Sequence, residues 1–352
     1  MTNENESVIK RAFLKLHGMV PTSGKILAVF IPLVLWGLWW TFSGVSYLFS
    51  TTEWHEISPS VHAKIMEVKT HPAFNNPDAD SSSKEDLEHQ KGRVLALAIV
   101  SRLEVELADG WTPQYLFVNP KSHFDNAVNR KIGVLTATTL LQKFFSTTMA
   151  KYGSMDPENP WMQEARERDF TYGPRTWGFF ERSSYSAYED GVANVHKYAD
   201  KLIGVKVADK RKDDSRAIVN IKANEIYEML TFVLSKNFID VALGWLSEPG
   251  ENLTWTELDD RVYFAQGMTL VLRDVITVLK ELYPEKITNV DKGGTENLEE
   301  AMVAMNKIST FNPLVVLRGK EDSMFADHRG KMARYMFTVR ERLLDVAETI
   351  RR

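Results

Sequence analysis

The chain of 352 residues contains no cysteine. This absence excludes a disulfide framework and a thiolate zinc site, and a large domain needs neither in order to fold. The chain also has no excess of basic residues, since 43 lysines and arginines stand against 47 acidic residues, for a net charge of −4. Nucleic-acid-binding proteins gather basic residues on one face, whereas here they are dispersed among acids. We therefore expect no nucleic-acid partner.

Catalytic and cofactor motifs are missing as well. The sequence has no His-Glu-x-x-His and no Gly-x-Ser-x-Gly motif, and Gly293-Gly294-Thr295 lacks the Lys-Ser/Thr that completes a phosphate loop. His123 and Asp125 are better explained as surface loop residues than as metal ligands. Glu104 and Glu106, two apart on a helix, do not face each other as an acid/base pair would. We predict no catalytic, cofactor-binding or metal-ligating residues and no cofactor, so an enzyme is the less favoured reading.

One long uncharged run is present, over residues 26–52 between Lys25 and Glu53. Because about 20 apolar residues in a helix cross a bilayer core of about 30 Å, the run predicts a transmembrane helix over residues 26–50. Its aromatic residues fit an anchor, since amphipathic rings favour the headgroup layer. The predicted anchor residues are Ile26, Trp36, Trp39, Trp40 and Tyr47.

Two other interpretations of the run are weaker. A secretory signal peptide has an apolar region of about 7 to 15 residues and ends at a small-x-small site. This run is longer and leaves through Ser46-Tyr47-Leu48-Phe49. A buried core helix rarely extends so far without a polar edge. We therefore favour an uncleaved anchor.

The flanking charges predict the orientation of this anchor. Residues 1–25 carry Lys10, Arg11, Lys15 and Lys25, whereas the basic residues of 51–70 are diluted by glutamates. Since cytoplasmic flanks are enriched in lysine and arginine, residues 1–25 are expected in the cytoplasm and the remainder outside it. In a bacterium this is a single-pass inner-membrane protein with a periplasmic C-terminal domain. The inverted topology remains open.

Composition divides the rest of the chain into two parts. Residues 51–88 hold Pro59, Pro72, Pro77 and the polar stretch 78–84, and we expect a stalk or loop region there. Residues 89–352 form the expected helical domain. Apolar residues recur there at three- and four-residue spacing, which predicts an all-α bundle of roughly six to eight helices. The expected helices cover residues 87–107, 134–150, 184–203, 218–246, 261–282, 296–308 and 329–350.

Three stretches resemble a bacterial envelope family known as domain of unknown function 2333. They are Gly110-Trp111-Thr112-Pro113 leading to Phe124-Asp125-Asn126 and Gly133-Val134-Leu135; the segment Tyr185 to Tyr198; and Leu258-Asp259-Asp260-Arg261-Val262-Tyr263 with Gly267. The resemblance implies a single N-terminal span followed by a helical domain. It implies no catalytic residues.

These observations favour a non-catalytic scaffold or accessory subunit of a bacterial envelope assembly, anchored in the bilayer. Its partner would be another protein or a second copy of the chain. Trp161 and Trp177 flank a polar stretch and are candidates for an interaction surface, although ordinary burial also explains them. The alternative is a membrane-tethered protein that binds or cleaves peptidoglycan or another glycan with a buried carboxylate. A sensor with its own output domain is disfavoured by the short predicted cytoplasmic segment.

Overall fold

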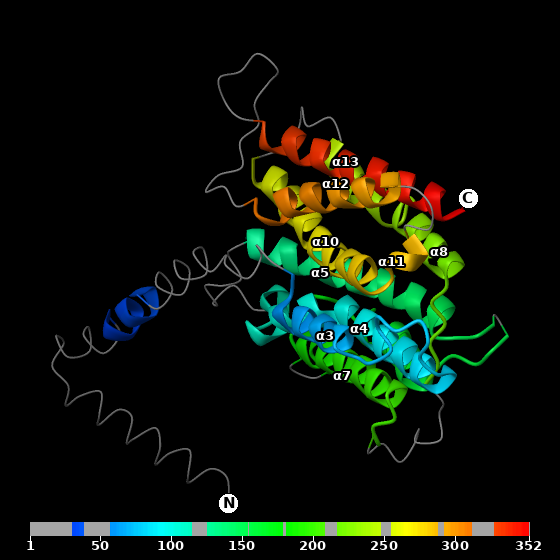
Figure 1. Ribbon diagram of the computed structural model, residues 1–352. Helices are drawn as coiled ribbons and strands as arrows, with labels where there is room; N and C mark the ends of the chain where they lie inside the picture. The colour runs from blue at the N-terminus through cyan, green and yellow to red at the C-terminus, as the bar shows by residue number, and fades with distance from the viewer. Residues whose placement is uncertain are drawn as a thin grey trace, which may run out of the picture.

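All regular structure in the described part of the chain is helical, as expected from the sequence. The computed structural model describes residues 30–38, 57–114, 125–153, 155–178, 181–207, 217–247, 255–287, 292–311 and 327–351. Beyond residue 57 the long helices lie side by side along the length of one bundle (Figure 1). They are α4 (Ser81–Ala108), α5 (Asp125–Phe144), α7 (Ser184–Leu202), α10 (Trp255–Leu282), α12 (Lys292–Ser309) and α13 (His328–Arg351).

Shorter helices complete the bundle, so its described part holds more helices than the six to eight expected. They are α3 (Pro59–Lys69), α6 (Pro160–Glu164), α8 (Ala223–Val233), α9 (Ile239–Ser247) and α11 (Pro284–Ile287). The expected helix over 218–246 is in fact α8 and α9. Between them the Ser235 hydroxyl accepts from the Asn237 amide at 3.3 Å, a local turn that competes with continued helix.

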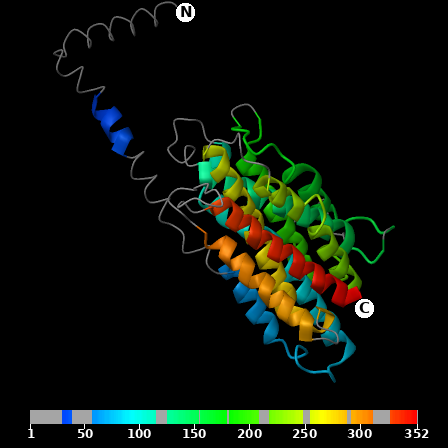
Figure 2. The ribbon, with the colours of Figure 1, turned by 90° about the horizontal axis from the view of Figure 1, so that it is seen from above.

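The bundle has three layers. Helices α5 and α10 form the centre, with α3, α4 and α7 on one side and α12 and α13 on the other (Figure 1). Seen from above, α12 and α13 lie side by side in front of the rest of the bundle (Figure 2). Helices α8 and α9 pack against α13. Because α10 has neighbours on several sides, it is apolar around most of its circumference, and its residues from Val262 to Leu272 are all buried.

Two glycines bring the central helices unusually close together. A methyl carbon built on Gly133 of α5 would lie 2.1 Å from the Phe264 carbonyl oxygen. One built on Gly267 of α10 would lie 2.1 Å from the Arg130 carbonyl oxygen. Each helix therefore needs glycine where it meets the backbone of the other.

The expected stalk is corrected from residue 57 onward. Residues 51–56 lie outside the described residues, but the following segment forms α3 and the start of α4. Val61, Ile65 and Val68 of α3 are buried in the common core. Of the prolines that suggested a stalk, Pro59 is compatible with this helix, since it occupies the first turn, where no intrahelical donor is needed. The domain therefore begins ahead of residue 89.

Candidate functional site

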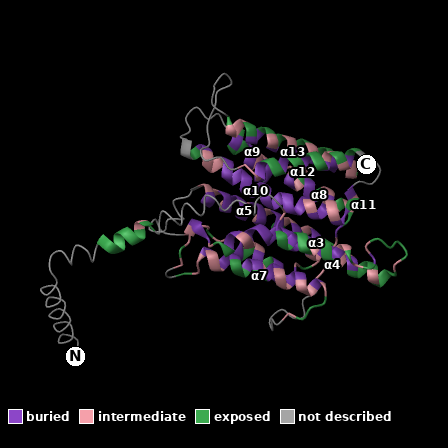
Figure 3. Ribbon diagram, turned by 60° about the vertical axis from the view of Figure 1, so that its left-hand side comes forward, coloured by how far each residue is buried: buried purple, intermediate pink, exposed green. Residues whose placement is uncertain are grey.

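The predicted membrane anchor is described only in part. Residues 30–38 are helical, and Trp36 lies among them, 46% exposed. Ile26, Trp39, Trp40 and Tyr47 lie outside the described residues. Phe30, Leu33 and Leu35 are 61%, 57% and 60% exposed, and Figure 3 shows this short helix as almost entirely exposed. Such a concentration of exposed large apolar side chains is unfavourable in water, at about 25 cal/mol per Å².

Helix α10 is an apolar helix of membrane-spanning length. Among the described residues, Glu257–Leu282 is the one stretch that meets a hydropathy criterion for a span, and 94% of its apolar window is buried inside the bundle. Its apolar side chains contact α4, α5 and α12 and are not available to lipid. Its composition is therefore explained as that of a central core helix.

The two tryptophans predicted as an interaction surface have different environments. Trp161 is completely buried. Asn159 caps the helix that begins at Pro160, accepting from the Trp161 amide at 3.1 Å, and the first turn directs the indole into the core. Trp161 is therefore not a surface residue, whereas Trp177 is 49% exposed.

Trp245 of α9 is also partly exposed. Its side chain is 42% exposed and stacks on Phe264 with ring centroids 4.4 Å apart. It lies in the last turn of α9, where the helix ends two residues later at Ser247.

Glu106 is the centre of one buried ion-pair cluster among the described residues. Arg130 donates from Nε to its Oε1 at 2.8 Å, and the Lys131 Nζ lies 3.4 Å from Oε2. Burial raises the pKa of Glu106, but the charges of Arg130 and Lys131 outweigh burial, so the net shift is downward. Lys131 also donates to the carbonyl oxygens of Glu106 and Gly110, at 3.0 and 2.7 Å. The cluster thus ties α5 to the C-terminal end of α4.

Asp274 of α10 is the centre of a second cluster. Arg102 of α4 donates to both of its carboxylate oxygens, at 2.7 and 3.0 Å, and the Ser58 amide donates at 3.3 Å. Burial raises the pKa of Asp274 and outweighs Arg102. This side chain joins α4, α10 and the residue before α3, which explains why the segment entering the bundle is held in place.

A cavity of about 520 Å³ lies beside the second cluster. It is lined by Ser58, Pro59, Ser60, Arg102, Val105, Ala108 and Asp109. Asp274 itself is fully buried and does not line it. Its charged residues are already bound, Arg102 to Asp274 and Asp109 to Lys131 at 3.3 Å. The walls therefore offer little unengaged charge to a ligand.

Buried carboxylates bear on the alternative of glycan cleavage. In the part of the chain that the structure describes, the buried acidic residues are Glu106, Asp169 and Asp274. Each is ion-paired, Asp169 to Arg182 at 2.9 Å. Burial raises the pKa of Asp169 and outweighs Arg182. None of the three lines either of the two cavities described in this section.

Two further pairs of residues were considered from the sequence, Glu104 with Glu106 and His123 with Asp125. Glu104 pairs with His196 of α7, whereas Glu106 pairs with α5, so the two glutamates face different neighbours as expected. His123 lies outside the described residues, as does the side chain of Asp125. The described ranges contain no group of three or more His, Asp and Glu side chains placed to hold a metal.

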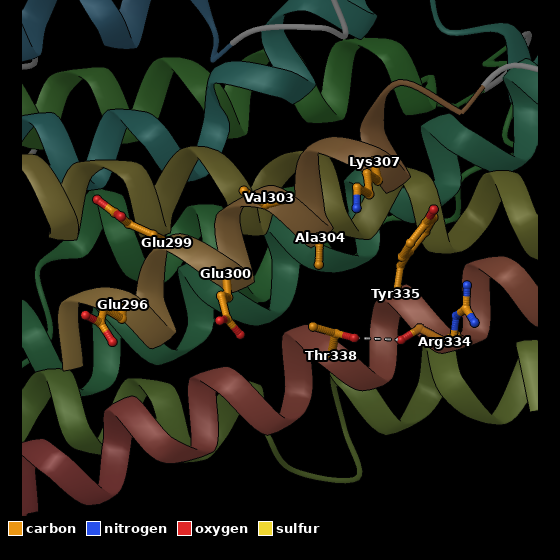
Figure 4. A pocket seen from close by; sticks show the side chains of 9 residues that line it. All are labelled: Glu296, Glu299, Glu300, Val303, Ala304, Lys307, Arg334, Tyr335 and Thr338. Atoms are coloured by element: carbon orange, nitrogen blue, oxygen red, sulfur yellow. Dashed lines mark hydrogen bonds between the residues drawn. The ribbon is translucent and has the colours of Figure 1, made fainter. Parts of the chain in front are cut away.

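An open groove of about 550 Å³ lies between α12 and α13 on the outer face of the bundle (Figure 4). Acidic side chains line one end of it and basic side chains the other. The lining residues are Glu296, Glu299, Glu300, Val303, Ala304, Lys307, Arg334, Tyr335 and Thr338. This surface is suited to a partner, because charge of both signs and an exposed apolar residue occur together.

Sequence reasoning did not identify this groove. The separation of charge along α12 is visible in the sequence, with glutamates at 296, 299 and 300 and a lysine at 307. What the sequence does not show is that α13 lies alongside and adds Arg334 to the basic end.

Comparison with protein-family models, curated proteins and solved structures finds no match for this chain. The resemblance to domain of unknown function 2333 is not tested by these comparisons and stays a prediction.

Proposed function

We propose that the chain is a single-pass protein of the bacterial inner membrane, anchored through residues 26–50, whose helical domain acts as a non-catalytic scaffold or accessory subunit of an envelope assembly. The observation that carries the anchor is the exposure of the apolar side chains in helix 30–38. The apolar residues of α10 are occupied by the bundle core, so this helix does not compete for the role of span.

The flanking charges support a cytoplasmic N-terminus and a periplasmic helical domain. A binding role is supported by the groove between α12 and α13, which offers exposed charge and an apolar residue. The non-catalytic part of the proposal is supported by the buried carboxylates. Glu106, Asp169 and Asp274 each hold helices or loops together through an arginine.

The anchor is tested by placing two arginines in the described part of the helix. Leu35→Arg with Leu38→Arg exchanges two exposed leucines for charges. Each exchange costs about 3 kcal/mol near the centre of a span, so the pair shifts insertion by more than about a thousandfold. We expect the full-length wild-type chain to resist alkaline carbonate extraction from membranes and the double variant to be released.

The matched control is Phe337→Arg with Leu344→Arg, which changes two apolar residues of the helical domain that are 46% and 43% exposed. This control should stay in the membrane fraction. Equal retention of the Leu35/Leu38 variant and the wild type would contradict the anchor.

Topology is tested by cysteine labelling, for which the cysteine-free chain is well suited. Met155 is 95% exposed, so Met155→Cys introduces one accessible thiol into the domain. A maleimide that does not cross membranes should label it once the outer membrane is removed, without lysis of the cell. Labelling only after lysis would establish the inverted topology instead.

A further inference from the structure

The exposed face of α12 has its charges arranged around one apolar residue. Val303 is 53% exposed. Glu299 lies four residues before it and Lys307 four residues after it, and all three line the groove (Figure 4). Glu296 and Glu300 extend the acidic end, and Arg334 of α13 extends the basic end.

Several of these charges have little to neutralise them. Within the described residues, Glu296, Lys307 and Arg334 form no ion pair. The ion pair of Glu299 there is with Lys280, at 3.4 Å, and both side chains are substantially exposed. Glu299 and Lys307 cannot neutralise each other, because eight residues of helix separate them by roughly 12 Å.

We propose that this face binds a second copy of the chain, with the two α12 helices antiparallel about a twofold axis at Val303. Antiparallel alignment about that residue places Glu299 of each copy opposite Lys307 of the other. The two Val303 side chains meet at the axis. The glutamate-rich end of each groove then lies against the end of the other that carries Arg334.

The second copy is favoured over an unrelated partner because the surface is complementary to itself. A twofold axis requires residue i to meet residue j and j to meet i, and charges of opposite sign at equal distances from Val303 satisfy this requirement. The axis is perpendicular to α12, so it can stand normal to a membrane, and both anchors then enter the same bilayer.

This inference rests on the proposed scaffold function and names its partner. Its readout is separate from that of the anchor, since carbonate extraction reports on the membrane and the following experiments report on pairing. If the chain does not pair, carbonate extraction still tests the anchor, and if the anchor fails, the pairing experiments still test the dimer.

The twofold contact is tested by cross-linking the full chain in native membranes. Val303→Cys adds the sole thiol of the chain, and a twofold axis brings it against its own copy at the separation a disulfide needs. Mild oxidation should convert Val303→Cys to a covalent dimer. Leu344→Cys, a control with 43% exposure on the other flank of α13, should stay monomeric under the same conditions. Equal cross-linking of the two variants would overturn the proposal.

Charge reversal distinguishes binding of a second copy of the chain from binding of a different protein. Glu299→Lys and Lys307→Glu each replace two attractive contacts with two repulsive ones, so each should weaken dimerisation by roughly tenfold. The double variant restores opposite charges across the axis and should dimerise within about twofold of the wild type. The measurement is sedimentation equilibrium of the full chain in density-matched detergent.

Three results of this measurement would overturn the proposal. They are a monomeric wild-type chain, a dimer unaffected by either single reversal, and a double variant no stronger than the single ones. The last two would place the contact elsewhere, for example in the anchors or against a different protein.

Discussion

Replacement of Gly267 by alanine tests the central contact of the fold. The new methyl carbon would lie 2.1 Å from the Arg130 carbonyl oxygen and 2.9 Å from the Val134 amide nitrogen. Since ordinary contacts of this kind are about 3.4 Å or more, α5 and α10 must separate by about 1 Å. The obstacle is backbone rather than a flexible side chain, so local rotamer changes do not relieve it.

The magnitude follows from two opposing effects. Overpacking a core costs about 1 to 3 kcal/mol and occasionally more, and the immobile backbone places this site at the upper end. Alanine recovers about 1 kcal/mol relative to glycine in a helix interior. We therefore expect Gly267→Ala to lower the free energy of unfolding by about 2 kcal/mol.

The assay is urea unfolding followed by far-UV circular dichroism, with Gly244→Ala as the control. Gly244 lies on the exposed face of α9, and an added methyl carbon would meet nothing within 4 Å. This control should gain up to about 1 kcal/mol. A Gly267→Ala protein as stable as the Gly244→Ala protein would refute the close contact. Gly133→Ala combined with Gly267→Ala should cost less than the sum of the two, because one separation relieves both clashes.

The buried ion pairs yield two further predictions. Glu106→Gln leaves Arg130 and Lys131 buried without their shared counter-charge. It should lower the free energy of unfolding, measured by urea unfolding, by about 3 to 5 kcal/mol. Glu104→Gln, at the partly exposed pair with His196, should lower the free energy of unfolding by less than about 1 kcal/mol. Equal losses in the two variants would contradict the conclusion that Glu106 is the buried, ion-paired one of the two glutamates. In the pH dependence, the folded pKa of Glu106 lies below its unfolded value of about 4.3. The contribution of Glu106 to the free energy of unfolding is therefore complete above the unfolded pKa, and it is lost as the pH falls through the folded pKa. Wild-type stability should fall more steeply on acidification than that of Glu106→Gln, and parallel profiles would contradict the downward shift.

The helices were predictable where their apolar periodicity is long and uninterrupted. The expected segments 184–203 and 329–350 match α7 and α13 to within a residue or two. The interruption between α8 and α9 was not predictable, because the apolar spacing continues through it. It depends on a local turn at Ser235 that adds a hydrogen bond without disturbing that spacing. The first helix of the domain was not predicted, because the prolines of residues 51–88 indicate breaks in helix, although Pro59 stands where a helix tolerates proline.

The candidate site was less predictable than the fold. Both charged ends of the groove depend on residues from α12 and α13, whose side-by-side packing is a tertiary property. The sequence left open whether Trp161 and Trp177 are exposed or buried, and the structure buries the first and exposes the second. Burial of a tryptophan depends on which neighbours cover it, and the helix period alone places it only on a face.

The sequence by itself determined the helical class, the exclusion of disulfide and thiolate chemistry, and the presence of one uncharged run long enough to span a bilayer. Those properties follow from composition and local periodicity. Only the tertiary structure decided that Glu106 is held by Arg130 and Lys131, that α5 and α10 meet at two glycines, and that α12 and α13 form a groove with opposite charges at its ends. Such features depend on how closely and at what register distant helices pack, because the energy of a contact is set by distances of a few ångströms that no local pattern specifies.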